Sequence, residues 1–487
     1  LDSGIFIYLS YFYKMGKKIS AFSDDALGTM DATALAEAIA TKKVSVKEVT
    51  EAAIARAEKV DPTLGAIVVK MYDDARHTEN LNTNAPFYGV PTFVKDNDFI
   101  KGYPTQKGTG AFVSKIAKKN SKYVNQFFST GVNCLGKTSL PEFGFICSVE
   151  NERWGITRNP WNTGYTTGGS SSGSGAMVAS GVVPIATAND GAGSTRIPAS
   201  CCGLVGLKPT RARLYYMEGT ETLPVNIVYQ GVLTRSVRDT AAFYAAAEKF
   251  HYNNKLPRIG HVQTPLQKRL RIAFFENVAE GKQGHNDEDT NRVQLETAKL
   301  LESLGHHVEM IKVPLDIEAL TLHYLTYYGF LSYMSINFGR LTQGAYVDKS
   351  VLEPFTLGLA DTFAKRKLKL FSSLKRLTKS AKETEAKLQQ KYDVIMTSVT
   401  TKRTPEIGYF SPKLSYDEIA WRGADFATYL PLFNISGSPA ISLPLGTASN
   451  GMPVGAQFVA PYGQDKLLLE LALELEAAQP WKFIYDK

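Results

Sequence analysis

Residues 168–210 contain two clusters of glycine and serine, at 168–175 and 191–194, on either side of an apolar stretch. Glycines at this density let the backbone adopt positive φ values and approach a ligand closely. Successive backbone amides in such loops form concave sites that bind negative charge. The run 182–188 between the clusters has the composition of a buried strand. The segment therefore predicts a ligand site built largely from backbone groups.

Two familiar uses of glycine-rich loops fit this segment poorly. A phosphate-binding loop needs a lysine directly after the glycines, and the nearest downstream lysine is Lys208. Residues 169–173 match G-x-S-x-G around Ser171, but a nucleophile elbow needs a preceding strand and a histidine base. We predict no strand at 162–167, and none of the seven histidines lies in a recognisable motif. A serine nucleophile with a lysine base is the chemistry that this pattern favours.

The block closely resembles the amidase signature family of serine hydrolases, which use a Ser-cisSer-Lys triad. The family pattern is a GGSSGG-like segment followed by D-x-G-G-S-[IV]-R-x-P and C-G-x-x-G-[LF]-K-P-T. This chain has GGSSSG at 168–173, DGAGSTRIP at 190–198 and CGLVGLKPT at 202–210. It departs from the pattern only by small changes: Ser172 and Ala192 each stand in place of a glycine, and Thr195 in place of a branched aliphatic residue.

Other segments extend the resemblance from about residue 30 to residue 478. They are PTFVKDN at 91–97, LGKTSLPEF at 135–143, FNISGSPAI at 433–441 and GMPVGAQ at 451–457. Two further segments, 154–161 and 404–408, look most like the bacterial branch that contains cyclic amide hydrolases of the nylon-oligomer type.

The resemblance implies an α/β fold, an α/β/α sandwich whose central mixed β-sheet is covered by helices on both faces. The sequence pattern agrees, because β-rich runs such as 270–275, 307–313 and 392–396 alternate with helical stretches such as 289–304. A capping box at Ser45 and Glu48 begins a helix that we expect to end at Asp61-Pro62. Near the C-terminus, Asn450-Gly451 predicts a turn between two strands.

We expect one large domain in this chain of 487 residues. It spans residues 16–487, with a helical part at about 25–62 and a catalytic core at about 63–480. Residues 1–15 are expected to be an N-terminal extension outside the fold, since Met15 could be a native start. Four cysteines without C-x-x-C spacing favour a reducing compartment, and we expect a cytoplasmic protein.

The resemblance implies the roles of the site residues. Ser194 falls at the nucleophile position, Ser170 at the bridging serine whose peptide bond to Gly169 is cis in the family, and Lys95 at the base. Lysine is a useful base only when burial lowers its pKa, and Phe93 and Val94 predict such burial. Asp96 and Asp98 oppose that shift, although strand alternation would turn Asp96 to the opposite face. The remaining candidates are the backbone amides of Gly191, Ala192, Gly193 and Ser194 as an oxyanion hole, Asp190 and Arg196 as a pair that braces the loop, and Gly169 and Ser171 as supporting residues.

The expected activity is hydrolysis of a carboxylic amide, or of an ester, through a serine acyl-enzyme. The expectation includes no metal and no cofactor, a small-molecule amide as substrate, no nucleic-acid partner, and a monomer or homodimer. One alternative is the amidating subunit of a tRNA-dependent glutamine amidotransferase, although Ile197 stands where that subunit has a polar pattern. Another is a catalytically dead binding protein.

Residues 363–382 hold eight Lys and Arg and no Asp or Glu. Four apolar residues share one face of the helix expected there: Leu370, Leu374, Leu377 and Ala381. A basic amphipathic helix can lie on an anionic membrane, but a surface helix packed on its own protein has the same pattern. We favour the surface helix and keep membrane contact through 363–382 as the alternative.

Overall fold

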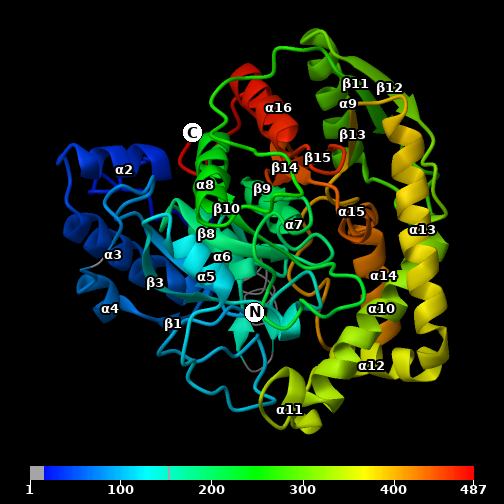
Figure 1. The fold of residues 1–487 in the computed structure, drawn as a ribbon, viewed down its shortest axis with the longest axis horizontal. Helices are drawn as coiled ribbons and strands as arrows, with labels where there is room; N and C mark the ends of the chain where they lie inside the picture. The colour runs from blue at the N-terminus through cyan, green and yellow to red at the C-terminus, as the bar shows by residue number, and fades with distance from the viewer. Residues whose placement is uncertain (1–15, 80, 152–153, 487) are drawn as a thin grey trace, which may run out of the picture.

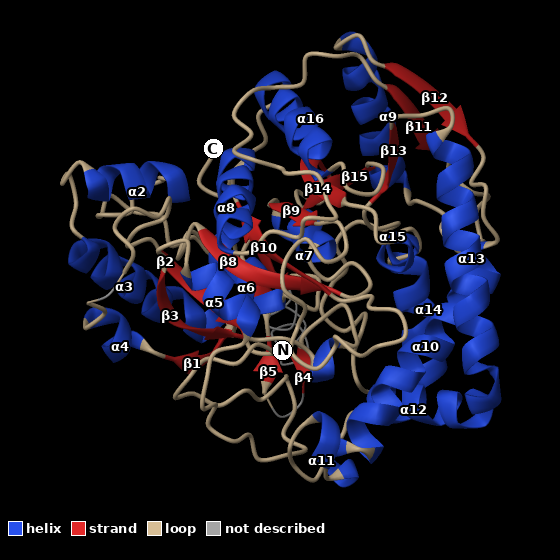
Figure 2. Ribbon diagram, in the orientation of Figure 1, coloured by secondary structure: helices blue, strands red, loops and turns tan. Residues whose placement is uncertain are grey.

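A mixed sheet of eleven strands forms the centre of the computed structural model, which describes residues 16–79, 81–151 and 154–486 (Figures 1 and 2). The predicted extension 1–15 lies outside the described residues. Parallel pairing joins β2 (Pro91–Lys95) to β3 (Asn133–Thr138) and to β8 (Ile185–Asp190). Antiparallel pairing joins β8 to β10 (Tyr229–Thr234), so the predicted α/β class with a mixed central sheet is confirmed.

The strand order is β1-β3-β2-β8-β10-β9-β14-β15-β13-β11-β12. The strands not yet given are β1 (Ile67–Lys70), β9 (Val205–Lys208), β11 (Arg271–Phe275), β12 (His307–Ile311), β13 (Val394–Ser398), β14 (Ala440–Thr447) and β15 (Pro453–Val459). Two small sheets stand apart, one of β4 (Glu150–Asn151) with β5 (Gly155–Ile156) and one of β6 (Arg158–Asn159) with β7 (Asn162–Thr166).

The helices form three groups, which Figure 2 shows in blue. Near the N-terminal strands lie α2 (Ala32–Ala40), α3 (Val46–Leu64), α4 (Tyr72–Arg76) and α5 (Lys122–Phe128). On the middle and C-terminal strands lie α6 (Ser172–Ala179), α7 (Arg196–Cys202), α8 (Val237–Phe250), α9 (Glu288–Ser303) and α16 (Asp465–Ala478). The third group is α10 (Ile317–Asn337), α11 (Gly339–Thr342), α12 (Pro354–Arg366), α13 (Leu370–Gln389), α14 (Tyr416–Phe426) and α15 (Leu430–Ser436).

Helix α3 begins as predicted and ends later than predicted. Ser45 Oγ accepts a hydrogen bond from Glu48 N at 3.2 Å, and Ser45 N donates to Glu48 Oε2 at 2.7 Å, which completes the capping box. The expected end at Pro62 is wrong, because Pro62 lies inside the last turn and the helix continues to Leu64. Pro62 has no N–H to donate to the carbonyl of Glu58, but only two residues follow it in the helix, so a single backbone bond is lost. The chain leaves the helix at Gly65, whose φ of 61° suits glycine.

The hairpin predicted at Asn450-Gly451 is confirmed, and the prediction that 162–167 form no strand is wrong. Strands β14 and β15 pair antiparallel on either side of Asn450-Gly451. Residues 162–166, for which we predicted no strand, form β7. This strand is half-buried. It pairs with the neighbouring β6 and also forms a β-bridge from Tyr165 to the distant Glu406, and the weak apolar pattern reveals neither contact.

The basic segment 363–382 does not form one helix. It covers the end of α12, a 3₁₀ turn (Lys367–Lys369) and the start of α13. The apolar face of α13 is buried in a core that also contains residues of α10 and α15, which is the packing that we favoured. In the part of the chain that the structure describes, no helix is long and apolar enough to cross a membrane.

Replacement of Leu377 by alanine should lower the free energy of unfolding by about 2–5 kcal/mol, because a buried leucine is truncated in a packed core. Denaturant unfolding followed by circular dichroism measures the change. Leu368, which is 92% exposed on the adjoining 3₁₀ turn, is the matched control, and L368A should change stability by less than about 0.5 kcal/mol. Equal losses in the two variants would contradict the assignment of this face to the core.

Candidate active site

Lys95 ends the buried strand β2 and is fully inaccessible to solvent. Its ammonium nitrogen has three hydrogen-bond acceptors: Ser170 Oγ at 2.8 Å, Ser171 Oγ at 3.0 Å and Asn189 Oδ1 at 2.7 Å. Of the three, the amide oxygen of Asn189 can only accept, whereas a serine hydroxyl can also donate. A neutral Lys95 can therefore keep Asn189 as acceptor and take a proton from Ser170.

Burial lowers the pKa of Lys95 to about 7, against the opposing effects of Asp98 and Asp190. Asp96 pairs with the ammonium of Lys137 at 2.5 Å. Asp98 is itself buried, which raises its pKa to about 6, and its carboxylate accepts from Gln230 Nε2 at 2.9 Å. The amine of Lys95 is therefore partly uncharged at neutral pH, the state that a general base requires.

Ser170 follows a cis peptide bond to Gly169, the only non-proline cis bond among the described residues. A side chain at Gly169 would lie 2.7 Å from the backbone of Cys147, so glycine is required at this position. The supporting Ser171 also contacts Lys95, and its Oγ lies 3.3 Å from both the N and the O of Asn189. The beginning of α6 thus presents two hydroxyls to the buried amine.

Ser194 lies where two cavities meet and is 7% exposed. Ser170 lines the larger cavity together with Ser194. Among the described residues no hydrogen bond joins the two side chains that share this space. The structure therefore brings Lys95 and Ser170 into contact and places Ser194 in the same cavity as Ser170.

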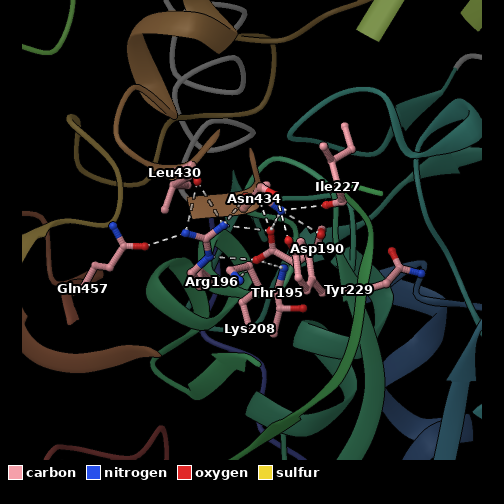
Figure 3. Close-up of polar contacts among 12 residues, drawn as sticks. Asp190, Thr195, Arg196, Lys208, Ile227, Tyr229, Leu430, Asn434 and Gln457 are labelled. Carbon is pink, nitrogen blue, oxygen red and sulfur yellow. Dashed lines mark hydrogen bonds and ion pairs between the residues drawn. The ribbon is translucent and has the colours of Figure 1, made fainter. Parts of the chain in front are cut away.

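The loop that carries Ser194 is held by a buried ion pair (Figure 3). Asp190 and Arg196 are both fully buried, and the Arg196 guanidinium contacts the carboxylate at 2.9 and 2.8 Å. Burial would raise the pKa of Asp190, but Arg196 and the amide of Asn434 hold it well below its usual range. Arg196 also donates to Gln457 Oε1 and Asn434 Oδ1, each at 2.6 Å. The predicted pair of Asp190 and Arg196 is thus joined by hydrogen bonds to Asn434 and Gln457 from the C-terminal part of the chain.

Of the four backbone amides predicted for the oxyanion hole, one is already occupied. Gly193 N donates to Asp190 Oδ1 at 2.7 Å, so this group supports the loop and we leave it out of the candidate donors. The amides of Gly191, Ala192 and Ser194 make no hydrogen bond among the described residues, and all three residues line the cavities. Tyr324 of α10 donates its hydroxyl to the carbonyl of Gly191 and so restrains the loop from the helical side.

Asn189, Thr187 and Tyr324 contact the site but were not predicted from the sequence motifs. Asn189 directly precedes the motif that begins at Asp190. That neighbouring motif was the only sequence feature that could have pointed to Asn189. Thr187 Oγ1 accepts from Lys95 N at 2.8 Å across two parallel strands, a contact that no local pattern reveals. Asn434 and Gln457 lie in two segments that carried the resemblance, but their contact with Arg196 needed the fold.

Comparison with known proteins identifies the family of this chain. The family model for amidases, described as "Amidase", matches residues 48–469. The protein named "Putative amidase AmiC" from Mycobacterium leprae (strain TN) is 46% identical over 466 residues, which are 96% of this chain and 98% of that protein. The 6-aminohexanoate-cyclic-dimer hydrolase of Paenarthrobacter ureafaciens is 32% identical over 479 residues, with 93% and 95% of the two chains covered.

A solved structure of 6-aminohexanoate cyclic dimer hydrolase superimposes with a TM-score of 0.83 at 30% identity, and covers 96% of this chain and 99% of that one. The fold and the serine-lysine site define an enzyme of the amide hydrolase class. The chain belongs to the amidase signature family, as the sequence motifs predicted, and it is an amidase.

Gly193 and Gly191 should respond differently to alanine, although they lie in one loop. A Cβ at Gly193 would lie 2.2 Å from Leu430 Cδ1 at a φ of 112°, whereas one at Gly191 would meet only Val228, at 3.9 Å. We expect G193A to lower the free energy of unfolding by at least about 1–2 kcal/mol and G191A to change it by less than about 1 kcal/mol. Thermal unfolding of both variants measures this, and equal stability would contradict the described loop conformation.

Proposed function

We propose that this amidase cleaves a carboxylic amide through an acyl-enzyme on Ser194, with Lys95 as general base and Ser170 as the proton relay. The observation that carries the proposal is the fully buried Lys95 amine, 2.8 Å from Ser170 Oγ in the cavity wall that also contains Ser194. A serine hydroxyl becomes an effective nucleophile only when a base accepts its proton. Lys95, with a pKa lowered to about 7 by burial, suits that role.

In the first step, Ser194 Oγ attacks the amide carbonyl carbon while its proton passes to Ser170, and the proton of Ser170 passes to Lys95. The relay requires Ser194 to come within hydrogen-bond distance of Ser170, a tightening that is common when substrate enters an empty site. The amides of Gly191, Ala192 and Ser194 are the donors proposed for the negative oxygen. In the second step the carbon–nitrogen bond breaks, and the amine leaves with a proton returned from Lys95 through Ser170. Water then attacks the acyl-enzyme by the same route and releases the acid.

The hydrolytic proposal is favoured over an amidotransferase subunit by the relatives at 30% identity or more, since those reported above are named as an amidase and as an amide hydrolase. The polar partners of Lys95 and Asp190 are all present, which argues against a dead binding protein.

Replacement of Ser194 by alanine should lower amide hydrolysis by at least about 10⁴-fold, because the nucleophilic oxygen is removed while the fold is kept. Turnover of simple aryl amides and labelling by a fluorophosphonate probe measure the effect. The probe should label the wild type, fail with S194A and label K95A weakly. Ser372 is an exposed serine on α13, three residues before Lys375. It is the matched control, and S372A should label normally. Unchanged turnover in S194A would refute the assignment.

The pH profile should report the base. Because the neutral amine is the active form, kcat/KM should rise with pH through an apparent pKa of about 7. N189D places a carboxylate at the acceptor position 2.7 Å from the amine, which favours the charged form and should move this limb to higher pH by about one unit or more. Asn84 is exposed, so N84D adds the same carboxylate in contact with solvent and serves as the control. A limb that stays in place in N189D would contradict the role of Lys95.

A further inference from the structure

The two cavities that meet at Ser194 have different linings. The smaller, of about 80 Å³, is lined largely by apolar side chains such as Phe145, Ile146 and Leu320, and no charged residue is among those that line it. The larger, of about 640 Å³, contains Lys107 and Glu218 besides its apolar walls. A substrate that spans Ser194 therefore meets an apolar environment on one side of the reacting bond and charged groups on the other.

Lys107 is a cation without a carboxylate partner. Its ammonium donates to Gln343 Oε1 at 2.7 Å and lies 5.8 Å from the centre of the Phe99 ring. In the described part of the chain no carboxylate lies within ion-pair distance of it. A lysine ammonium has three donors, so two of them are left for a ligand in the cavity.

Lys107 keeps a pKa above neutrality although its surroundings lower it. Burial and the nearby Lys137 lower the pKa of Lys107 to about 8, and Asp98 and Asp96 act against that shift. The amine is therefore mostly protonated at neutral pH. A partly desolvated ammonium binds a carboxylate more strongly than the same group would in open water.

Two other groups of the larger cavity bear on the ligand. Asn97 Oδ1 is buried without a hydrogen-bond donor, so it offers an acceptor for a substrate N–H. Glu218 is the one acidic residue of the lining, and its carboxylate lies 3.8 Å from the exposed Lys119 ammonium, which balances its charge at the protein surface.

We propose that the larger cavity binds a substrate carboxylate at Lys107, so that the preferred substrates are amides that carry a carboxylate on one side of the scissile bond. This inference rests on the proposed function of Ser194, and it names the substrate class of that same site. The carboxylate can belong to the acyl part, which makes the product a dicarboxylic acid, or to the amine part, which makes the product an amino acid.

Two pairs of substrates distinguish these sources. Glutaryl 4-nitroanilide and 5-hydroxypentanoyl 4-nitroanilide differ only in an acid or an alcohol on the acyl side. N-acetyl-5-aminopentanoate and N-acetyl-5-aminopentan-1-ol differ in the same way on the amine side. The wild type should prefer the acid in one of the pairs, and that pair identifies the part of the substrate that occupies the larger cavity.

The decisive quantity is the acid-to-alcohol ratio of kcat/KM, which cancels any general loss of activity in a variant. K107M should lower this ratio by about 10- to 100-fold, mainly through KM, because a charge-assisted hydrogen bond to the carboxylate is lost. K107R keeps the charge and should retain most of the preference. Lys101 is exposed in the same region of the sequence, so K101M removes an equal charge and should leave the ratio and the activity unchanged.

A ratio near one for the wild type in both pairs, or an equal ratio in the wild type and K107M, would overturn the assignment of Lys107. The proposed function would still stand in that case if the wild type hydrolyses the alcohol substrates and S194A does not. If the wild type cleaves none of the four substrates and is not labelled by the fluorophosphonate probe, both the proposed function of Ser194 and the assignment of Lys107 are overturned.

Discussion

The buried ion pair of Asp190 and Arg196 is the interaction on which the arrangement of the site depends. A buried ion pair is stable only when further hydrogen bonds satisfy its remaining donors and acceptors. Here the amide of Asn434, the carboxamide of Gln457 and the backbone N–H of Gly193 fulfil that requirement. The pair therefore joins the end of β8 to α7, α15 and β15, and it fixes the loop that presents Ser194.

The same dense packing that stabilises the sheet also sets the chemistry of Lys95. Strand β2 has neighbours on both sides, β3 and β8, so its last side chain points into a region without solvent. Burial there lowers the pKa of the amine, and Asn189 and the two serines supply hydrogen bonds that water would otherwise provide. The packing of this strand thus sets the pKa on which the proposed acid–base role of Lys95 depends.

The helical group formed by α10 and its neighbours defines the space in front of the site. Residues of α10 line both cavities, among them Tyr328, and Tyr324 also holds the oxyanion loop through the carbonyl of Gly191. Residues 320–357 are mostly helical, in α10, α11 and the start of α12. The sheet therefore carries Lys95, the loops before α6 and α7 carry Ser170 and Ser194, and the helical group lines the cavities in front of them.

Much of this protein was determined by local sequence. The glycine and serine clusters, the lysine after an apolar strand and the turn at Asn450-Gly451 are each encoded within a few residues, because backbone freedom, burial and turn geometry are short-range properties. Together with the family resemblance they predicted the α/β class, which the structure confirms, and the candidates Lys95, Ser170 and Ser194, of which Lys95 and Ser170 are in contact.

Tertiary structure decided the rest. The contact of Asn189 with Lys95 spans 94 residues, and that of Gln457 with Arg196 spans 261. The occupation of the Gly193 amide and the isolated charge of Lys107 likewise depend on which groups the folded chain brings together. Such contacts follow from the order of the strands in the sheet, and no pattern within a single segment contains that order.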